Sequence, residues 1–203
     1  MGYTTDFNGS LTLSRPATQE EIEYINKFSE TRRMKRDVEK LFELFEGKHG
    51  NPHAKTREEI YGNEGEYFVG GLGSFGQDSD ASVINNNCPP GQLPWGERKS
   101  YEDNDELIEK GLCQPGLWCQ WILTSDGTEL QWDGGEKFYY YSEWLKYLIN
   151  HFFEKWDIKL NGEIEWVGED SDDRGIIVVK NNKVKVFVAQ ITYPGYGEDE
   201  DEE

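Results

Sequence analysis

Ser142-Glu-Trp-Leu-Lys-Tyr-Leu-Ile-Asn-His-Phe-Phe-Glu-Lys-Trp156 is the stretch of sequence that decides the fold. Its apolar residues recur at intervals of three and four, so they form one broad stripe on a helix that Ser142 is expected to cap. Full burial of such side chains stabilises a protein by about 1.5–3 kcal/mol each. We therefore predict that this helix lies at the centre of the core. The stripe consists of Trp144, Leu145, Leu148, Ile149, Phe152, Phe153 and Trp156.

Short apolar runs on both sides of this helix predict strands. Several runs are joined by Asp-Gly, Asn-Gly or Asn-Asn pairs, which tolerate the positive φ that tight hairpins require. Strands connected by such turns pair antiparallel, so we expect a mostly antiparallel sheet. The predicted strands are residues 10–14, 66–69, 117–123, 129–132, 163–167, 176–179 and 184–193.

Further helices are predicted nearer the N-terminus. Thr18 and Glu21 have the spacing of a capping box, and a second helix over 38–45 is stopped by Gly47. A short helix is expected over 105–110. The rest of residues 48–112 is rich in Gly, Asn and Pro, and an irregular segment of this length is typically functional or ordered by its aromatic residues.

Together these elements predict one α+β domain over residues 1–196, with a mostly antiparallel sheet and helices on one face. Residues 48–112 are expected to form a largely irregular insertion, and residues 197–203 a disordered acidic tail. The strand–helix starts at Ser10 and Glu129 make a ferredoxin-like layout one option.

Charge and composition exclude several classes of function. The formal net charge is −19, and the last six residues carry six of these charges, which leaves −13 on the remainder. Such a field repels nucleic acid and anionic membranes and attracts cations or a basic partner protein, although it can also serve solubility alone. The chain has no apolar run that would span a membrane and no signal peptide. Its three cysteines, an odd number, favour reduced thiols in the cytoplasm.

No complete catalytic or cofactor motif is present, so the sequence does not identify catalytic residues. Gly71–Gly76 matches G-x-G-x-x-G, but no helix is expected after it, as the dinucleotide fingerprint requires. The run that starts at Asp170 resembles a calcium loop, but Arg174 and Asn181 stand where oxygen ligands are needed. The cysteines lack the spacing of a zinc site. We predict no cofactor and no metal.

Three groups of side chains are candidates for ligand binding. The first is a basic cluster that can bind an anion or pair with the protein's own acids. The second has Trp118 and Gln120 on one face of a predicted strand, which suits a pocket wall or a buried, hydrogen-bonded Gln. The third has carboxylates beside aromatic rings, where they can act as acids or stabilise turns. The full set is Arg32, Arg33, Arg36, Gln77, Asp80, Asn87, Gln114, Trp118, Gln120, Asp133, Glu136 and Tyr139.

Several long strings resemble a family of proteins encoded widely in bacterial and bacteriophage genomes. They are Thr31-Arg-Arg-Met-Lys-Arg-Asp37, Gln114-Pro-Gly-Leu-Trp-Cys-Gln-Trp121, Trp132-Asp-Gly-Gly-Glu-Lys-Phe-Tyr139 and Leu160-Asn-Gly-Glu-Ile-Glu-Trp166. The resemblance runs from Gly2 to about Tyr193, and the acidic tail lies outside it. The family has no assigned activity, so the resemblance implies only a cytoplasmic bacterial or viral setting.

Two hypotheses of function follow. The first is a non-catalytic, cytoplasmic binding or regulatory protein that acts by protein–protein contact, for example a phage-encoded modulator of a host factor or an acidic mimic of nucleic acid. The alternative is a small-molecule-binding protein or enzyme for a nucleotide-like anion. Its pocket would be formed by the segments Arg32–Arg36, Gln77–Asn87, Gln114–Trp121 and Trp132–Tyr141. A virion component is a third option, and the oligomeric state is left open.

Overall fold

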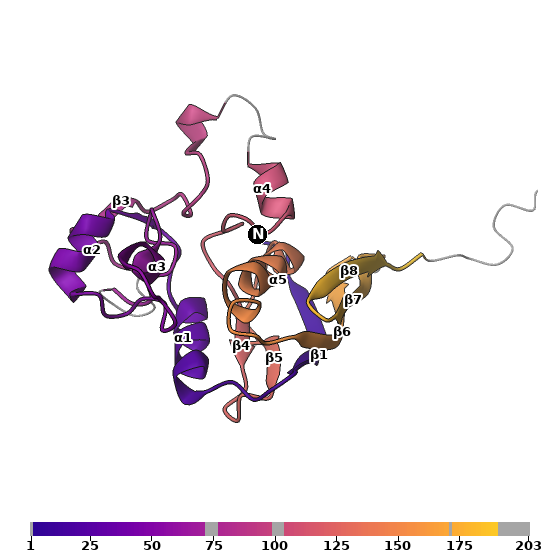
Figure 1. Cartoon of the computed structure of the whole chain (residues 1–203). Coiled ribbons are helices and arrows are strands. Elements are labelled where there is room, and N and C mark those ends of the chain that lie inside the picture. The colour runs from indigo at the N-terminus through magenta and orange to yellow at the C-terminus, as the bar shows by residue number, and fades with distance from the viewer. Residues whose placement is uncertain (1, 72–76, 99–103, 171, 191–203) are drawn as a thin grey trace, which may run out of the picture.

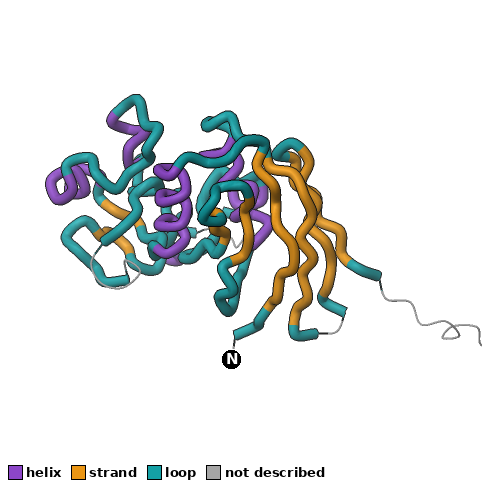
Figure 2. Tube along the Cα trace, turned by 90° about the horizontal axis from the view of Figure 1, so that it is seen from below, coloured by secondary structure: helices purple, strands orange, loops and turns teal. Residues whose placement is uncertain are grey.

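The protein is built on a six-stranded antiparallel sheet with helices on one face, as a computed structural model shows for residues 2–71, 77–98, 104–170 and 172–190 (Figures 1 and 2). The strand order is β4-β5-β1-β6-β7-β8, and every neighbouring pair is antiparallel. The predicted α+β class is therefore confirmed. The strands are β1 (Thr5–Leu13), β4 (Trp121–Leu123), β5 (Glu129–Trp132), β6 (Leu160–Gly168), β7 (Arg174–Lys180) and β8 (Lys183–Val188).

Two helices connect the strands and cover the buried face of the sheet. Helix α1 (Gln19–Glu30) follows β1, and α5 (Tyr141–Leu148) leads through a π-helical turn, Ile149–Phe153, to β6. The elements β1, α1, β4, β5, α5 and β6 thus run in the order β-α-β-β-α-β, an order that the ferredoxin-like option shares. Strands β7 and β8 extend the sheet beyond β6.

The core lies between these helices and the sheet. All seven residues of the predicted stripe are buried, none of them more than 5% exposed. Along β6, Ile164 and Trp166 point into this core while Glu163 and Glu165 face solvent, so the opposite face of the sheet is open. The predicted cap is wrong: Tyr140, in the left-handed region at φ 56°, is the N-cap residue, and Ser142 lies inside the first turn.

Several predicted strands need correction. Strand β1 begins at Thr5 instead of Ser10, and β6 already includes the predicted Asn161–Gly162 turn. Residues 66–69 form turns and extended coil instead of a strand, because Phe68 packs into a separate apolar cluster. The predicted strand 117–123 begins only at Trp121, since the carbonyl of Leu117 accepts a hydrogen bond from Arg33 N at 2.9 Å outside the sheet. Residues 191–193 of the last predicted strand, like the acidic tail, lie outside the described residues.

A small lobe stands beside α1, away from the sheet (Figure 1). It contains much of the segment predicted as irregular, and its apolar cluster is centred on Leu41, Tyr61 and Phe68. Capping fixes its helices, because Asp37 caps α2 and a Thr56–Glu59 capping box begins α3. Its elements are β2 (Lys35–Arg36), α2 (Val38–Phe45), α3 (Arg57–Tyr61) and β3 (Val83–Asn85), followed by the turn Trp95–Glu97 and by α4 (Asp105–Glu109).

The predicted Thr18–Glu21 capping box is confirmed at the start of α1. The Thr18 side chain accepts from Glu21 N, while Glu21 accepts from Thr18 N at 2.8 Å.

None of the helices in the described ranges has the length and apolar character that crossing a bilayer requires.

Candidate functional sites

Arg33, predicted as a ligand-binding residue, is a buried structural tie. Its guanidinium is 1% exposed and donates to the carbonyls of Glu66 and Phe68 at 3.0 and 2.9 Å and to Gln114 Oε1 at 3.3 Å. It also lies 4.0 Å above the centre of the Phe28 ring. Burial lowers the pKa of Arg33 to about 10, which leaves it charged at neutral pH. Arg33 and Gln114, which were both predicted to bind a ligand, do contact each other, but they are buried in the core.

Arg36 is likewise used internally. It is 1% exposed and pairs with the buried Asp80 carboxylate at 2.8 Å, with Ser82 Oγ at 2.9 Å as a further acceptor. Burial raises the pKa of Asp80, but its hydrogen bonds from Ser82 and the charge of Arg36 outweigh this and hold it below the ordinary value. The alternative that the basic cluster pairs with the protein's own acids is confirmed for Arg36.

The remaining predicted residues make local contacts, are half-buried or are exposed. Gln120 donates to the Glu136 carbonyl at 2.9 Å and accepts from Trp132 Nε1 at 3.1 Å, while Asp133 stabilises a turn by accepting from Gly135 N. Burial raises the pKa of Asp133. Asn87 accepts from Arg32 at 3.2 Å. Trp118 is half-buried, and Gln77 and Tyr139 are exposed.

The predicted pocket would need Arg33, Arg36 and Gln114 at its surface. All three are 1% exposed or less, so they cannot contact a ligand in this structure. The four segments do not combine into one open site around them, and the exposed candidates stay predictions. Within the described ranges, His, Cys, Asp and Glu form no group of three or more that would hold a metal ion.

The open edge of the sheet is the first site that the fold creates. Strand β8 is last in the strand order, so among the described strands it pairs with β7 alone. Ala189 N donates to Arg174 O across that pair, and the pairing alternates along a strand, so the amides of Val184, Val186 and Val188 point away from β7. Val186, Phe187 and Val188 are 42%, 51% and 66% exposed. An edge with free donors and exposed apolar side chains is a template for another strand.

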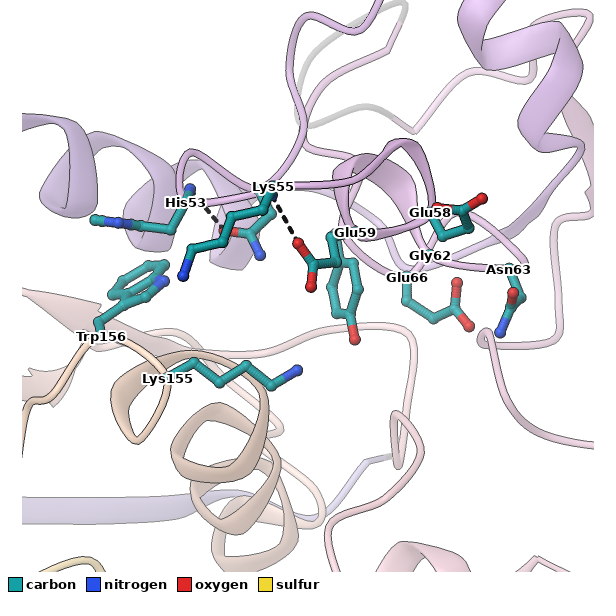
Figure 3. Close-up of a pocket in the computed structure, with 11 residues that line it drawn as sticks. His53, Lys55, Glu58, Glu59, Gly62, Asn63, Glu66, Lys155 and Trp156 are labelled. Carbon is teal, nitrogen blue, oxygen red and sulfur yellow. Dashed lines mark hydrogen bonds between the residues drawn. The ribbon is translucent and has the colours of Figure 1, made fainter.

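A cleft between the small lobe and the end of the α5–π helix is the second site (Figure 3). Its volume is about 550 Å³, which is large enough for a small ligand. Figure 3 shows His53, Lys55 and Trp156 toward one end, with Glu66 toward the other. The cleft is lined by Asn51, His53, Lys55, Glu58, Glu59, Gly62, Asn63, Glu66, Tyr67, Lys155 and Trp156.

His53 is held in place by a buried carboxylate. Its Nε2 lies 3.1 Å from Glu21 Oε1, and Glu21 also accepts two bonds from Arg15 at 2.8 and 2.9 Å. Burial raises the pKa of Glu21, but the bonds from Arg15 and Thr18 outweigh it and lower the pKa overall. The imidazole ring packs against Trp156, with 5.2 Å between the ring centres.

The charges of the cleft are only partly matched. Within the described part of the chain, Lys55, Lys155 and Glu66 form no ion pairs. Glu66 accepts from Glu64 N at 2.7 Å, and burial raises its pKa. Glu59, which lies between the two ends, is used as a cap and accepts from the amides of Lys55 and Thr56.

His151 supports one wall of the cleft and makes stability depend on pH. It stacks on Tyr147 with 4.0 Å between ring centres, and its Nδ1 is 3.0 Å from the Tyr67 hydroxyl. Burial lowers the pKa of His151 from 6.5 to about 4. The unfolded chain therefore binds this proton more readily, and stability is lost as pH falls from 6.5 to about 4.

We expect His151→Phe to remove this contribution, which amounts to about 3 kcal/mol at most. Urea unfolding of both proteins at about pH 7 and about pH 4.5 measures it, and the carboxylates shared by the two proteins cancel in the comparison. If both proteins lost the same free energy of unfolding between about pH 7 and about pH 4.5, His151 would not be the cause of the pH dependence.

Sequence reasoning missed both sites. His53, Lys55 and Glu66 of the cleft belong to the lobe, whereas Lys155 lies more than 80 residues further along the chain. Docking of the lobe onto the helix end brings them together. The edge was within reach of the sequence, because the run Lys183–Val188 alternates lysine and apolar residues, but its place in the strand order was not. No family model, curated protein or solved structure matches this chain. The resemblance to bacterial and bacteriophage proteins therefore stays a prediction.

Proposed function

We propose that the protein acts by protein–protein contact and binds an extended segment of its partner as a seventh strand along β8. The observation that carries the proposal is the unpaired edge at Val184, Val186 and Val188, flanked by exposed apolar side chains. Binding by strand addition draws affinity from backbone hydrogen bonds and specificity from alternate side chains. No catalytic group is required for this role.

Charge indicates which segment fits. Lys180, Lys183 and Lys185 lie together around a shallow concavity with Val178 and Phe187, in a chain whose net charge is −19. Screening limits interactions at the protein surface to about 8 Å at physiological ionic strength, so these lysines dominate the local field. The partner segment that matches them has acidic residues opposite the lysines and apolar residues opposite Val186 and Phe187.

The family resemblance would place this contact in a bacterial or viral cytoplasm, with a host factor as the partner. A modulator of this kind needs an accessible binding edge and a rigid scaffold. The sheet supports this proposal, because β7 and β6 hold β8 on one side, while no strand of the described residues pairs with its other side.

The test uses the acetylated hexapeptide Val-Tyr-Val-Glu-Val-Glu amide and a control in which both Glu residues are Lys. We expect the acidic peptide to bind about tenfold more tightly, because the control places like charges beside Lys183 and Lys185. Isothermal titration calorimetry at low and physiological salt measures the difference.

Val186→Pro provides the matched variant. Proline removes an amide that points away from β7, which an edge strand tolerates, whereas Val186→Thr keeps the amide. Binding of the acidic peptide should be lost in the proline variant and kept in the threonine variant, with thermal unfolding of both close to the wild type. Equal binding by the two variants would contradict strand addition.

A further inference from the structure

We infer that the cleft between the small lobe and the end of the α5–π helix binds a small zwitterion, a molecule with a carboxylate at one end and an ammonium group at the other. Amino acids and short peptides belong to this class. This inference is independent of strand addition, since the cleft and β8 share no residues.

One end of the cleft offers positive charge. Lys55 and Lys155 both line the cleft, and neither forms an ion pair within the described part of the chain. The Lys155 ammonium lies 5.9 Å from the centre of the Tyr67 ring, which attracts a cation without neutralising it. Glu59 is the acid of the cleft whose pKa is lowered by the hydrogen bonds from the Lys55 and Thr56 amides and, after them, by the charges of these two lysines. A ligand carboxylate would give the lysines a direct partner with charge-assisted hydrogen bonds.

The other end offers negative charge. Glu66 is half-buried and accepts one backbone bond, at 2.7 Å from Glu64 N, and it has no cationic partner among the residues described. A partly buried carboxylate without a counter-charge is costly, so an ammonium group of a ligand stabilises it. Glu58 also lines the cleft, and Figure 3 shows Glu58 and Glu66 toward the same end.

Hydrogen bonds and ring packing support the groups beside these charges. Glu21 is 0% exposed and holds His53, while His53 packs on Trp156. At the acidic end Gly62 leaves room, because a Cβ there would meet Glu66 Oε2. A polar cleft that carries lysines and glutamates beside such supported groups selects for charge separation in the ligand more than for hydrophobic bulk.

The class is tested with 6-aminohexanoate, compared with hexanoate and hexylamine, which keep the chain and remove one charge each. Amide chemical shifts of the ¹⁵N-labelled full chain report the site of binding. We expect 6-aminohexanoate to shift residues that line the cleft and to bind about tenfold more tightly than either control. A series with glycine, 4-aminobutyrate and triglycine then measures the separation of charges that fits best.

Variants identify the two ends. Glu66→Gln should weaken 6-aminohexanoate about tenfold and leave hexanoate unchanged, whereas Lys155→Met should weaken both. Glu43→Gln and Lys40→Met, on the exposed side of α2, are the matched controls and should change neither. Thermal unfolding verifies that each variant is folded.

Three results would overturn the inference. If hexanoate binds as tightly as 6-aminohexanoate, the site recognises only an anion, and if hexylamine does so, it recognises only a cation. If none of the probes shifts cleft residues at about 10 mM, the cleft is not a zwitterion site. None of these results bears on peptide binding at β8.

Discussion

Arg33→Met is expected to lower the free energy of unfolding by about 3 kcal/mol, because it leaves buried carbonyl groups without a donor. Arg33 donates to the carbonyl of Phe68 and to Gln114 Oε1, and it shares the carbonyl of Glu66 with Gln114 Nε2. These acceptors belong to the small lobe and to the segment before β4, so the guanidinium holds the lobe against α1. Methionine fills similar space, so the loss measures polar contacts and not a cavity.

Urea unfolding followed by tryptophan fluorescence measures this loss. Arg32→Met is the matched control, because the hydrogen bonds of Arg32 to described residues go to Asn86 O and Asn87 Oδ1 near the surface. Its loss should cost less than about 1 kcal/mol. If the two variants were equally stable, Arg33 would not be a structural tie, and its predicted role in binding an anion would return.

Asp80→Asn is expected to cost about 3–5 kcal/mol, because it leaves Arg36 as a buried charge without a counter-charge. The two groups are 2.8 Å apart, and their side chains are 1% and 6% exposed. Ser82 bonds the same carboxylate through its hydroxyl and, at 2.8 Å, through its amide, so the loop that leads to β3 depends on this ion pair.

A double-mutant cycle separates the ion pair from its surroundings. Asp80→Asn combined with Arg36→Met should be less destabilised than the sum of the single variants, since removing both charges also removes the unpaired one. Urea unfolding at neutral pH measures all four proteins. Additive losses would contradict a direct coupling between Asp80 and Arg36.

Much of the fold could be predicted because it depends on local patterns. The stripe from Trp144 to Trp156 marks the core helix, and the Thr18–Glu21 pair marks the start of α1, since periodicity and capping are properties of neighbouring residues. The Phe68 region was misread because an apolar run alone does not distinguish a strand from a coil that packs in a cluster. Gln120 was predicted within a strand, but β4 begins one residue later, and the Gln120 side chain bonds Trp132 at the end of β5 and the carbonyl of Glu136.

The candidate sites could be predicted far less well. Several of the expected residues do meet, as Arg33 with Gln114 and Arg36 with Asp80, but sequence cannot show whether such groups face solvent or each other. The cleft depends on how the lobe docks, and the edge depends on strand order. Both are long-range properties, and no single motif encodes them.

The most direct test of the proposed strand addition is hydrogen exchange at β8, measured by NMR with and without the acidic hexapeptide. We predict that the peptide slows exchange at the amides of Val184, Val186 and Val188 and leaves Lys185 and Phe187 as they are, since these already pair with β7. Peptide binding that leaves the three valine amides unprotected would contradict the account.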